Sequence, residues 1–243
     1  AAEQGYIKAQ HNLGLMYENG RGVTQNYPEA LKWYRLAAEQ GAARTQNNLG
    51  TMYANGHGVT QSYPEALKWY RLAAEQGDAW AQNNVGGMYQ FGLGVIQNSQ
   101  EALKWFRLAA KQGNASAQNN IGAMYVNGQG VTQNYPEALQ WFRRAAEQGH
   151  ADAKNNLGAM YANGHGVTVN RVLAHALYNL AKSLGNNEKA GENLAELSAS
   201  MPSAEITVAQ ALAAEMSKPG NFLKAMDQAA PPPKPAAPRR KKQ

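Results

Sequence analysis

Cysteine and long hydrophobic runs are both missing from this 243-residue sequence. Without cysteine the chain has no disulfide framework, no thiolate zinc site and no cysteine nucleophile, although the redox compartment stays open. Because no run of about 18 apolar residues occurs, we expect no membrane-spanning helix. The sequence does have 44% hydrophobic residues against 16% charged ones. This balance is typical of a folded chain that buries a sizeable core.

The excess of positive charge is confined to the C-terminus. The net charge is +6, and the last thirteen residues hold five basic side chains and no acid. Without them the chain has 18 basic and 17 acidic residues, so the folded part should be nearly neutral. That balance is not typical of a nucleic-acid-binding surface. The five basic residues are Lys234, Arg239, Arg240, Lys241 and Lys242.

A period of 36 residues runs through the chain as far as about Gly185. Each repeat has an apolar residue followed by glycine, then a methionine and a tyrosine, and four repeats keep a tryptophan at one phase. Self-similarity of this length predicts stacked helical repeats. The apolar–glycine pairs are Leu13-Gly14, Leu49-Gly50, Val85-Gly86, Ile121-Gly122 and Leu157-Gly158.

Each repeat is predicted to fold as two helices. In the second repeat, apolar or small residues of segment 43–53 recur at intervals of three and four, which indicates a helix. Two glycines within segment 55–58 supply a cap and a turn. Ser62 then opens a second helix that ends at Gly77, with proline in its first turn and Glu65 completing a capping box. The device recurs as Asn26 with Glu29, Asn98 with Glu101, and Asn134 with Glu137.

The glycine inside each predicted first helix requires compensation, because it costs roughly 1 kcal/mol relative to alanine. We expect the second helix to approach closely at this point. In the second repeat, small Ala66 has the phase that matches Gly50, and Trp69 would fill the space beside it. Replacing such a glycine by leucine should overpack the helix pair by about 1 to 3 kcal/mol.

Two segments of the third repeat and the loop between them carry a family resemblance. Residues 81–89 read Ala-Gln-Asn-Asn-Val-Gly-Gly-Met-Tyr, a Gly-x-Gly-Val loop follows, and residues 101–110 read Glu-Ala-Leu-Lys-Trp-Phe-Arg-Leu-Ala-Ala. These segments resemble Sel1-like repeats, longer-looped relatives of tetratricopeptide repeats, in five tandem copies over about three quarters of the chain.

The resemblance implies an all-α fold, a right-handed α-solenoid of antiparallel helix pairs that serves as an adaptor or scaffold. It slightly favours a bacterial periplasmic or secreted location over a cytoplasmic one. A cysteine-rich branch of the family carries a β-lactamase label, and this chain lacks the cysteines of that branch.

The N-terminal end departs from the complete repeat. Residues 1–5 match the close of a second helix at residues 37–41. We therefore expect the chain to begin at the end of a truncated upstream repeat, followed by five repeats over 6–185.

The C-terminal end departs more strongly. Helical spacing predicts helices at 186–201 and 203–216, within a capping segment 186–218 that covers the last apolar face. Residues 219–243 are predicted to form a flexible, Pro-rich basic tail, in which Phe222 to Met226 form at most one weak turn.

No group of side chains is predicted to perform catalysis or to hold a metal or cofactor. The repeated glutamates are explained by capping or lie near helix ends. His57 and His165 share a loop phase where Leu93 stands in the third repeat, and no two histidines form a helical metal pair. The glycine loops follow a helix and not a strand, so we interpret them as turns. All five histidines are interpreted as surface residues: His11, His57, His150, His165 and His175.

Two recurring features of the first helices have competing explanations. The methionine and tyrosine stripe is interpreted as core, because every repeat must bury its own face against its neighbours. An asparagine also recurs without a break, and it either hydrogen-bonds backbone in the adjacent loop or helix or forms a row of amides that hold a peptide. These residues are Asn12, Asn48, Asn84, Asn120 and Asn156.

Departures from the period are the better functional signal. Trp80 stands where the other repeats have Lys8, Arg44, Ser116 and Asp152, and Phe91 stands where the others have asparagine. With Asn84 and Gly87 these aromatics are offset by four, seven and eleven residues, so they lie along one stripe of one helix. The stripe predicts a pocket on the concave side of the solenoid, and packing of both aromatics against neighbouring loops is the alternative. Arg44 and Lys8 are either partners for an acidic group or solvated residues.

We therefore predict a non-enzymatic scaffold that binds a peptide or protein on its concave face, without cofactor, metal or small-molecule substrate. A hydrolase, by resemblance to the labelled branch, is one alternative. Another is binding of nucleic acid or anionic membrane by the basic tail, which is equally compatible with an inert terminus. The predicted partner-binding residues are Trp80, Asn84, Gly87, Phe91, Arg44, Asn48 and Asn120.

Overall fold

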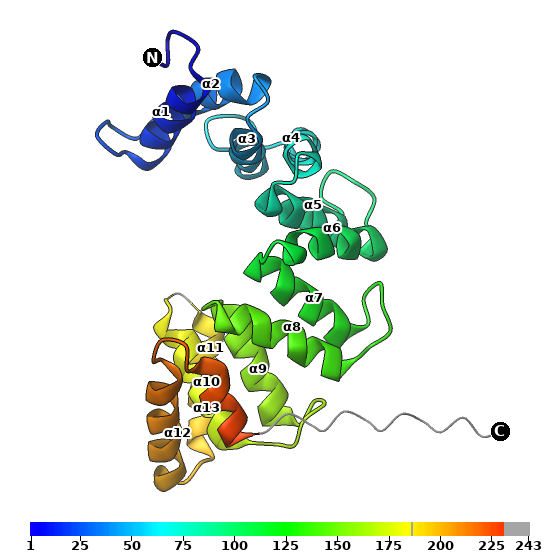
Figure 1. Ribbon diagram of the computed structural model, residues 1–243, viewed down its shortest axis with the longest axis vertical. Helices are drawn as coiled ribbons and strands as arrows, with labels where there is room; N and C mark the ends of the chain where they lie inside the picture. The colour runs from blue at the N-terminus through cyan, green and yellow to red at the C-terminus, as the bar shows by residue number, and fades with distance from the viewer. Residues whose placement is uncertain (186, 231–243) are drawn as a thin grey trace, which may run out of the picture. The chain divides into compact units, whose positions relative to one another are not determined.

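The computed structural model describes residues 1–185 and 187–230, and this part of the chain folds as thirteen α-helices without a strand (Figure 1). The prediction of an all-helical fold built from repeated helix pairs is confirmed. The five pairs are α1 (Ile7–Asn19) and α2 (Tyr27–Glu39), α3 (Ala43–Asn55) and α4 (Tyr63–Glu75), α5 (Ala79–Phe91) and α6 (Ser99–Lys111), α7 (Ala115–Asn127) and α8 (Tyr135–Glu147), and α9 (Ala151–Asn163) and α10 (Arg171–Ser183). Three further helices follow: α11 (Glu188–Ala199), α12 (Ser203–Met216) and α13 (Phe222–Ala229).

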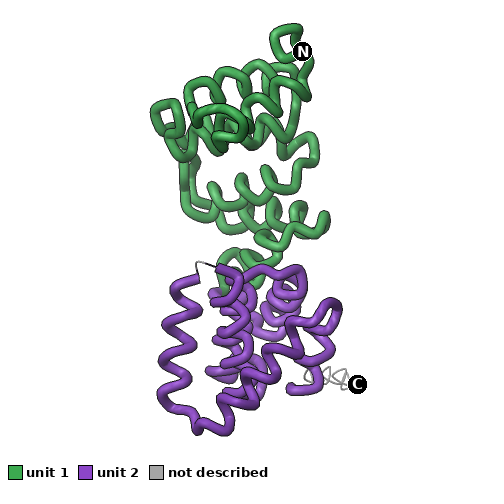
Figure 2. The backbone as a smooth tube through the Cα atoms, turned by 90° about the vertical axis from the view of Figure 1, so that its left-hand side faces the viewer, with its two compact units in different colours: residues 1–124, 128–132 green, residues 125–127, 133–243 purple. Residues whose placement is uncertain are grey.

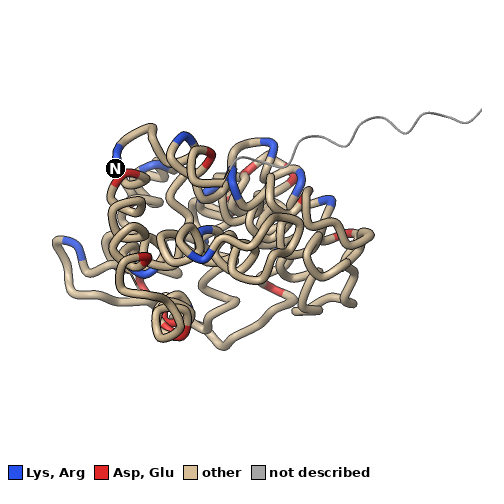
Figure 3. The backbone as a smooth tube through the Cα atoms, turned by 90° about the horizontal axis from the view of Figure 1, so that it is seen from below, with Lys and Arg blue, Asp and Glu red and all other residues tan. Residues whose placement is uncertain are grey.

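The chain divides into two compact units (Figure 2). Unit 1 consists of residues 1–124 and 128–132, and unit 2 of residues 125–127 and 133 onward. In unit 1 the helices of each complete pair pack on each other, and α2 and α4 also contact the first helix of the next repeat. In unit 2, α10 packs on α9, α11 and α12. Lysine and arginine residues are interspersed with acidic ones along the chain (Figure 3).

An aromatic ring, and not the predicted alanine and tryptophan, explains the glycine inside each first helix. A Cβ atom added at Gly50 would lie 2.6 Å from Cδ1 of Tyr70, a ring on α4 that is almost completely buried. Trp69 is only half-buried. The prediction that the two helices approach closely was right. The contact is made by Tyr70, the residue after the tryptophan, because Tyr70 faces α3.

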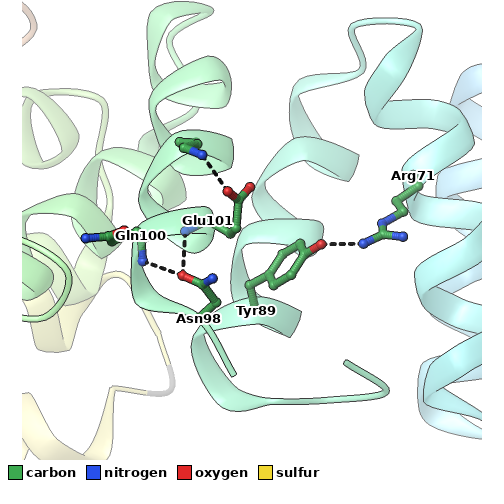
Figure 4. Close-up of polar contacts among 6 residues, drawn as sticks. Arg71, Tyr89, Asn98, Gln100 and Glu101 are labelled. Carbon is green, nitrogen blue, oxygen red and sulfur yellow. Dashed lines mark hydrogen bonds and ion pairs between the residues drawn. The ribbon is translucent and has the colours of Figure 1, made fainter. Parts of the chain in front are cut away.

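Helices α2, α4, α6 and α8 begin with the predicted cap, but only half of the capping box forms. The Oδ1 atom of Asn98 accepts hydrogen bonds from the amides of Gln100 and Glu101, at 3.0 and 3.1 Å (Figure 4). The backbone amide of Asn98 donates to the Tyr89 carbonyl at 2.9 Å. The Glu101 carboxylate pairs with Lys104. The N-cap amide is thus bonded to the preceding helix, which leaves the glutamate side chain free to pair with a lysine one turn on.

Buried glutamines connect consecutive repeats, a role that the sequence analysis missed. Gln46 Nε2 donates to the Ala38 carbonyl at 3.0 Å, and its Oε1 accepts from Gln76 Nε2 at 2.8 Å. One side chain therefore links the end of α2, helix α3 and the end of α4. In the fifth repeat Lys154 stands at this phase, with its ammonium group 5.1 Å from the centre of the Phe222 ring. Burial lowers the pKa of Lys154.

The C-terminal helices α11 and α12 form where the spacing predicted them, but the expected weak turn at Phe222 was wrong. Helix α13 extends through Ala229 and buries Phe222, Ala225 and Met226. Arg143 Nη2 lies 2.6 Å from Asp227 Oδ1. The predictions for residues 231–243 lie outside the described residues. Among the helices that are described, none has the length and apolar character needed to cross a lipid bilayer.

Candidate functional site

Helix α5 presents the two aromatic side chains that depart from the repeat. Asp78 caps the helix by accepting the Ala81 amide at 2.8 Å, and Gly92 ends it in the left-handed conformation. Trp80 is 62% exposed and Phe91 is 68% exposed. Neither ring is enclosed between hairpins, so local packing does not explain them.

A hollow of about 290 Å³ lies beside Phe91 in unit 1 and is named here the α5 groove. Its lining includes Tyr63 and Tyr70 from α4, Asn84, Gly87 and Phe91 from α5, and Asn120 from α7. A Cβ atom added at Gly87 would meet nothing within 4 Å, so this glycine faces open space. Of the predicted site residues, Asn84, Gly87, Phe91 and Asn120 line the groove, whereas Trp80, Arg44 and Asn48 do not.

Asn84 and Asn120 bond to side chains, so the backbone partners expected for them were wrong. Asn84 Nδ2 donates to Asn47 Oδ1 at 2.9 Å, and Asn120 Nδ2 donates to Asn83 Oδ1 at 3.1 Å. Helices α3, α5 and α7 each carry two consecutive asparagines, and in α5 and α7 the second of these reaches the first asparagine of the preceding first helix. These bonds fix the amides at the floor of the α5 groove.

Asn48 and Arg44 lie on α3, outside the α5 groove. The Asn48 side chain hydrogen-bonds the hydroxyl of Tyr34, whose pKa is raised by burial and by the adjacent Glu18 carboxylate. Arg44 is exposed and forms no ion pair with any described residue. It occupies on α3 the phase that Trp80 occupies on α5, so it offers a positive charge one repeat away.

Ile96 and Leu93 are apolar residues beside this site that the sequence analysis did not select. Ile96 is 89% exposed in the loop after α5, where the other repeats have threonine. Leu93 lines the α5 groove. Both residues depart from the repeat, as Trp80 does, so the same comparison of the repeats over the loop would have selected them.

The histidines are not all surface residues, which corrects the prediction for His175. This side chain is 3% exposed, replaces a repeated leucine, and its Nδ1 has no hydrogen-bond partner. Burial lowers the pKa of His175. His57 and His165 stack on Tyr27 and Tyr135, with ring centres 4.6 and 4.9 Å apart.

Comparison with known families and structures identifies the repeats. The Sel1 repeat model matches residues 7–41, 43–78, 81–114, 115–150 and 151–186. A Sel1 repeat protein from Oxalobacter formigenes has a TM-score of 0.74 and 33% identity, over 86% of this chain and 88% of that one. No curated protein matches the chain.

Two further solved structures have related folds. The protective antigen c5321 of uropathogenic Escherichia coli strains, described as displaying an SLR fold, has a TM-score of 0.72 and 36% identity. That match covers 93% of this chain but only 47% of the antigen, so the chain spans less than half of the antigen's length. The immunity protein PA5088 from Pseudomonas aeruginosa shares the fold, with a TM-score of 0.56 and 20% identity over 90% of this chain and 86% of that protein.

Proposed function

The chain belongs to the Sel1 repeat family, and we propose that it is a non-enzymatic scaffold that binds a peptide or protein partner through unit 1. The observation that carries the proposal is the pair of exposed aromatics, Trp80 and Phe91, on the α5 stripe that borders the α5 groove. Repeat packing does not require either residue. Exposed tryptophan and aromatic residues beside a pocket are typical of interface hot spots.

The α5 groove supplies both apolar surface and fixed polar groups. Full burial of an aromatic side chain such as Phe91 contributes about 1.5–3 kcal/mol, and Tyr63 and Leu93 extend the apolar lining. The amides of Asn84 and Asn120 are held by hydrogen bonds and still offer acceptor and donor capacity to a peptide backbone. This combination favours an extended segment with an apolar side chain over a small polar solute.

The acids of the repeats lend no support to the hydrolase alternative. Glu29, Glu65 and Glu101 each pair with the lysine three residues on. These carboxylates are half-buried and lie in the first turn of a helix, where a negative charge is favourable. They therefore have a structural explanation that does not involve acid–base chemistry.

The proposal is tested by comparing the proteins captured by wild type and by a Trp80→Ala, Phe91→Ala variant. Both side chains are exposed, so the variant should keep its helical circular dichroism. A Leu36→Ala, Leu72→Ala variant removes two exposed leucines of α2 and α4 and is the matched control. Loss of a hot-spot residue typically costs 2 kcal/mol or more, so affinity for a captured partner should fall at least 30-fold in the first variant alone. Identical partners and affinities for all three proteins would reject the proposal.

A further inference from the structure

Unit 2 contains a larger hollow of about 420 Å³, named here the α11 groove. Its lining comes from three helices and includes Asn155 of α9, Arg171 and Tyr178 of α10, and Lys189, Asn193 and Glu196 of α11. Pockets of this size accept a short segment of ligand. The α11 groove plays no part in the function proposed above.

The α11 groove occupies the same position in the repeat as the α5 groove. Asn193 Nδ2 donates to Asn155 Oδ1 at 2.9 Å, as Asn84 donates to Asn47 at 2.9 Å. Helix α11 thus takes the place of a first helix beside α9, although its sequence does not follow the repeat. The Tyr178 ring packs against Gly158, as the Tyr70 ring packs against Gly50.

Counting from the bonded asparagines shows which side chains have changed. Four residues before Asn84 and Asn193 stand Trp80 and Lys189. Three residues after them stand Gly87 and Glu196, and seven residues after them stand Phe91 and Ser200. At the head of the second helix, Arg171 replaces Tyr63. The positions of Tyr63, Gly87 and Phe91 in the α5 groove, and that of Trp80 on the same helix outside its lining, therefore carry charged or hydroxyl groups in the α11 groove.

The charges of the α11 groove are not neutralised by one another. Arg171 Nη2 donates to the Ser200 carbonyl at 2.8 Å and also contacts the Ser200 hydroxyl. Among the described residues, Arg171, Lys189 and Glu196 form no ion pair. Burial raises the pKa of Tyr178 to about 12, and the Glu196 charge adds to the rise. The phenol therefore stays neutral and can donate a hydrogen bond.

The spacing of these groups defines the shape of a ligand. Lys189 and Ser200 are eleven residues apart on α11, which corresponds to about 16 Å at 1.5 Å per residue. Because Arg171 is bonded to Ser200, the two cations mark opposite ends of the groove, with Glu196 between them. A single small anion is too short to reach both cations. An extended peptide covers the distance with about five residues, at roughly 3.3 Å each.

We propose that the α11 groove binds an extended peptide segment of a partner protein, with acidic side chains at both ends and a basic side chain between them. The acids face Arg171 and Lys189, the basic residue faces Glu196, and the bonded asparagines line the floor beneath the segment. Complementary charge in this order selects the segment and sets its register.

The probe is an acetylated peptide of sequence Ser-Glu-Ser-Lys-Ser-Ser-Glu-Ser, titrated into the full-length ¹⁵N-labelled chain and followed by NMR. We expect saturable shifts of the Asn155 and Asn193 side-chain amides, and an affinity about tenfold weaker for Lys189→Glu and for Arg171→Gln. Lys224→Glu makes the same charge change at an exposed residue of α13, outside the groove, and should bind as wild type does. The peptide with lysine and glutamate exchanged should not bind.

Three results would overturn the inference. The first is no saturation at about 2 mM peptide, which is about the weakest affinity worth assigning. The others are equal binding of the charge-exchanged peptide, and equal weakening of binding by Lys224→Glu and Lys189→Glu. Lys189 has no partner in the described structure, so its substitution should not disturb folding even if that of Arg171 does. The Trp80→Ala, Phe91→Ala variant should bind this peptide normally. Failure here is therefore distinct from failure of the function proposed for unit 1.

Discussion

The α5 and α11 grooves have the same kinds of residue at their floor but different side chains around it, which form their walls. In each, a tyrosine ring packs against a glycine of the first helix, and an asparagine of the next helix bonds to an asparagine before it. Around this floor, unit 1 places Gly87, Phe91 and Tyr63, whereas unit 2 places Glu196, Ser200 and Arg171. Trp80 and Lys189 stand at the same position of α5 and α11, but only Lys189 lines its groove. The same scaffold thus supports an apolar and a charged surface.

This difference separates two kinds of residue. Glycine, tyrosine and asparagine at the floor contact each other and hold neighbouring helices at a fixed spacing. Exposed side chains around the floor, such as Phe91 and Lys189, can change without loss of the fold. On the proposals made above, binding chemistry is carried by positions that depart from the repeat.

The largest expected effect tests whether the two floors are equivalent. Gly50→Leu and Gly158→Leu should each lower the free energy of unfolding of their unit by about 1–3 kcal/mol, because a Cβ at either site would lie 2.6 Å from a tyrosine ring. Gly87→Ala is the control and should gain about 0.5–1 kcal/mol, since its added methyl group meets nothing. Urea denaturation measures all three. A loss at only one of the two floor sites would show that the floors differ.

Exchanging the walls should exchange the ligands. A variant with Tyr63→Arg, Trp80→Lys, Gly87→Glu and Phe91→Ser carries the α11 pattern on the α5 floor. We expect it to bind the acid–base–acid peptide about tenfold more tightly than wild-type unit 1 does, measured in a Lys189→Glu background, because opposite charges select the segment. The same four positions changed to alanine should give no gain. A gain in the alanine variant would contradict the role of charge.

The pH dependence should distinguish α10 from α4. At the position where α4 has Leu67, α10 has His175, whose pKa burial lowers below the usual 6.5. The unfolded chain takes up a proton first as the pH falls through about 6.5, so the contribution of His175 to the stability of unit 2 is present above that pH and is lost as the pH falls below it.

His175→Leu restores the residue of the repeat and should remove this pH dependence. At pH 8 we expect a small gain in stability, because the variant removes a buried nitrogen without a partner. At pH 5 the gain should rise to about 1 kcal/mol, because the variant also avoids the loss caused by titration of His175. Thermal unfolding of both proteins at the two pH values measures the difference. A gain that is the same at pH 5 and pH 8 would be inconsistent with titration of His175.

The smallest expected effect is the difference between the caps at the heads of α4 and α10. Ser62→Ala and Asn170→Ala should each cost about 0.5–2 kcal/mol through loss of the cap. Asn170 Nδ2 also donates to the Ala229 carbonyl at 3.1 Å, so its loss should cost about 0.5–1 kcal/mol more than that of Ser62. Equal costs would indicate that the end of α13 contributes nothing to unit 2. Chemical denaturation provides both values.

Local sequence signals were sufficient for much of the fold and for part of the candidate site. Capping residues such as Ser62 and Asn98 marked helix starts because their side chains bond amides three residues away. Trp80 and Phe91 were found because they interrupt a strict period. Arg44 and Asn48 were placed in the same site by phase alone, although they lie outside the groove that Phe91 lines.

The sequence by itself determined the helix pairs, their caps and the exceptional residues, since each depends on contacts or comparisons at short or regular spacing. Only the tertiary structure decided that Tyr70 and not Trp69 meets Gly50, that Asn84 bonds Asn47, and that α11 continues the row of first helices. It also decided that Phe222 and Met226 are buried in a helix. These features depend on which faces of separate helices meet, and burial against a neighbouring element outweighs the weak local preference of the segment.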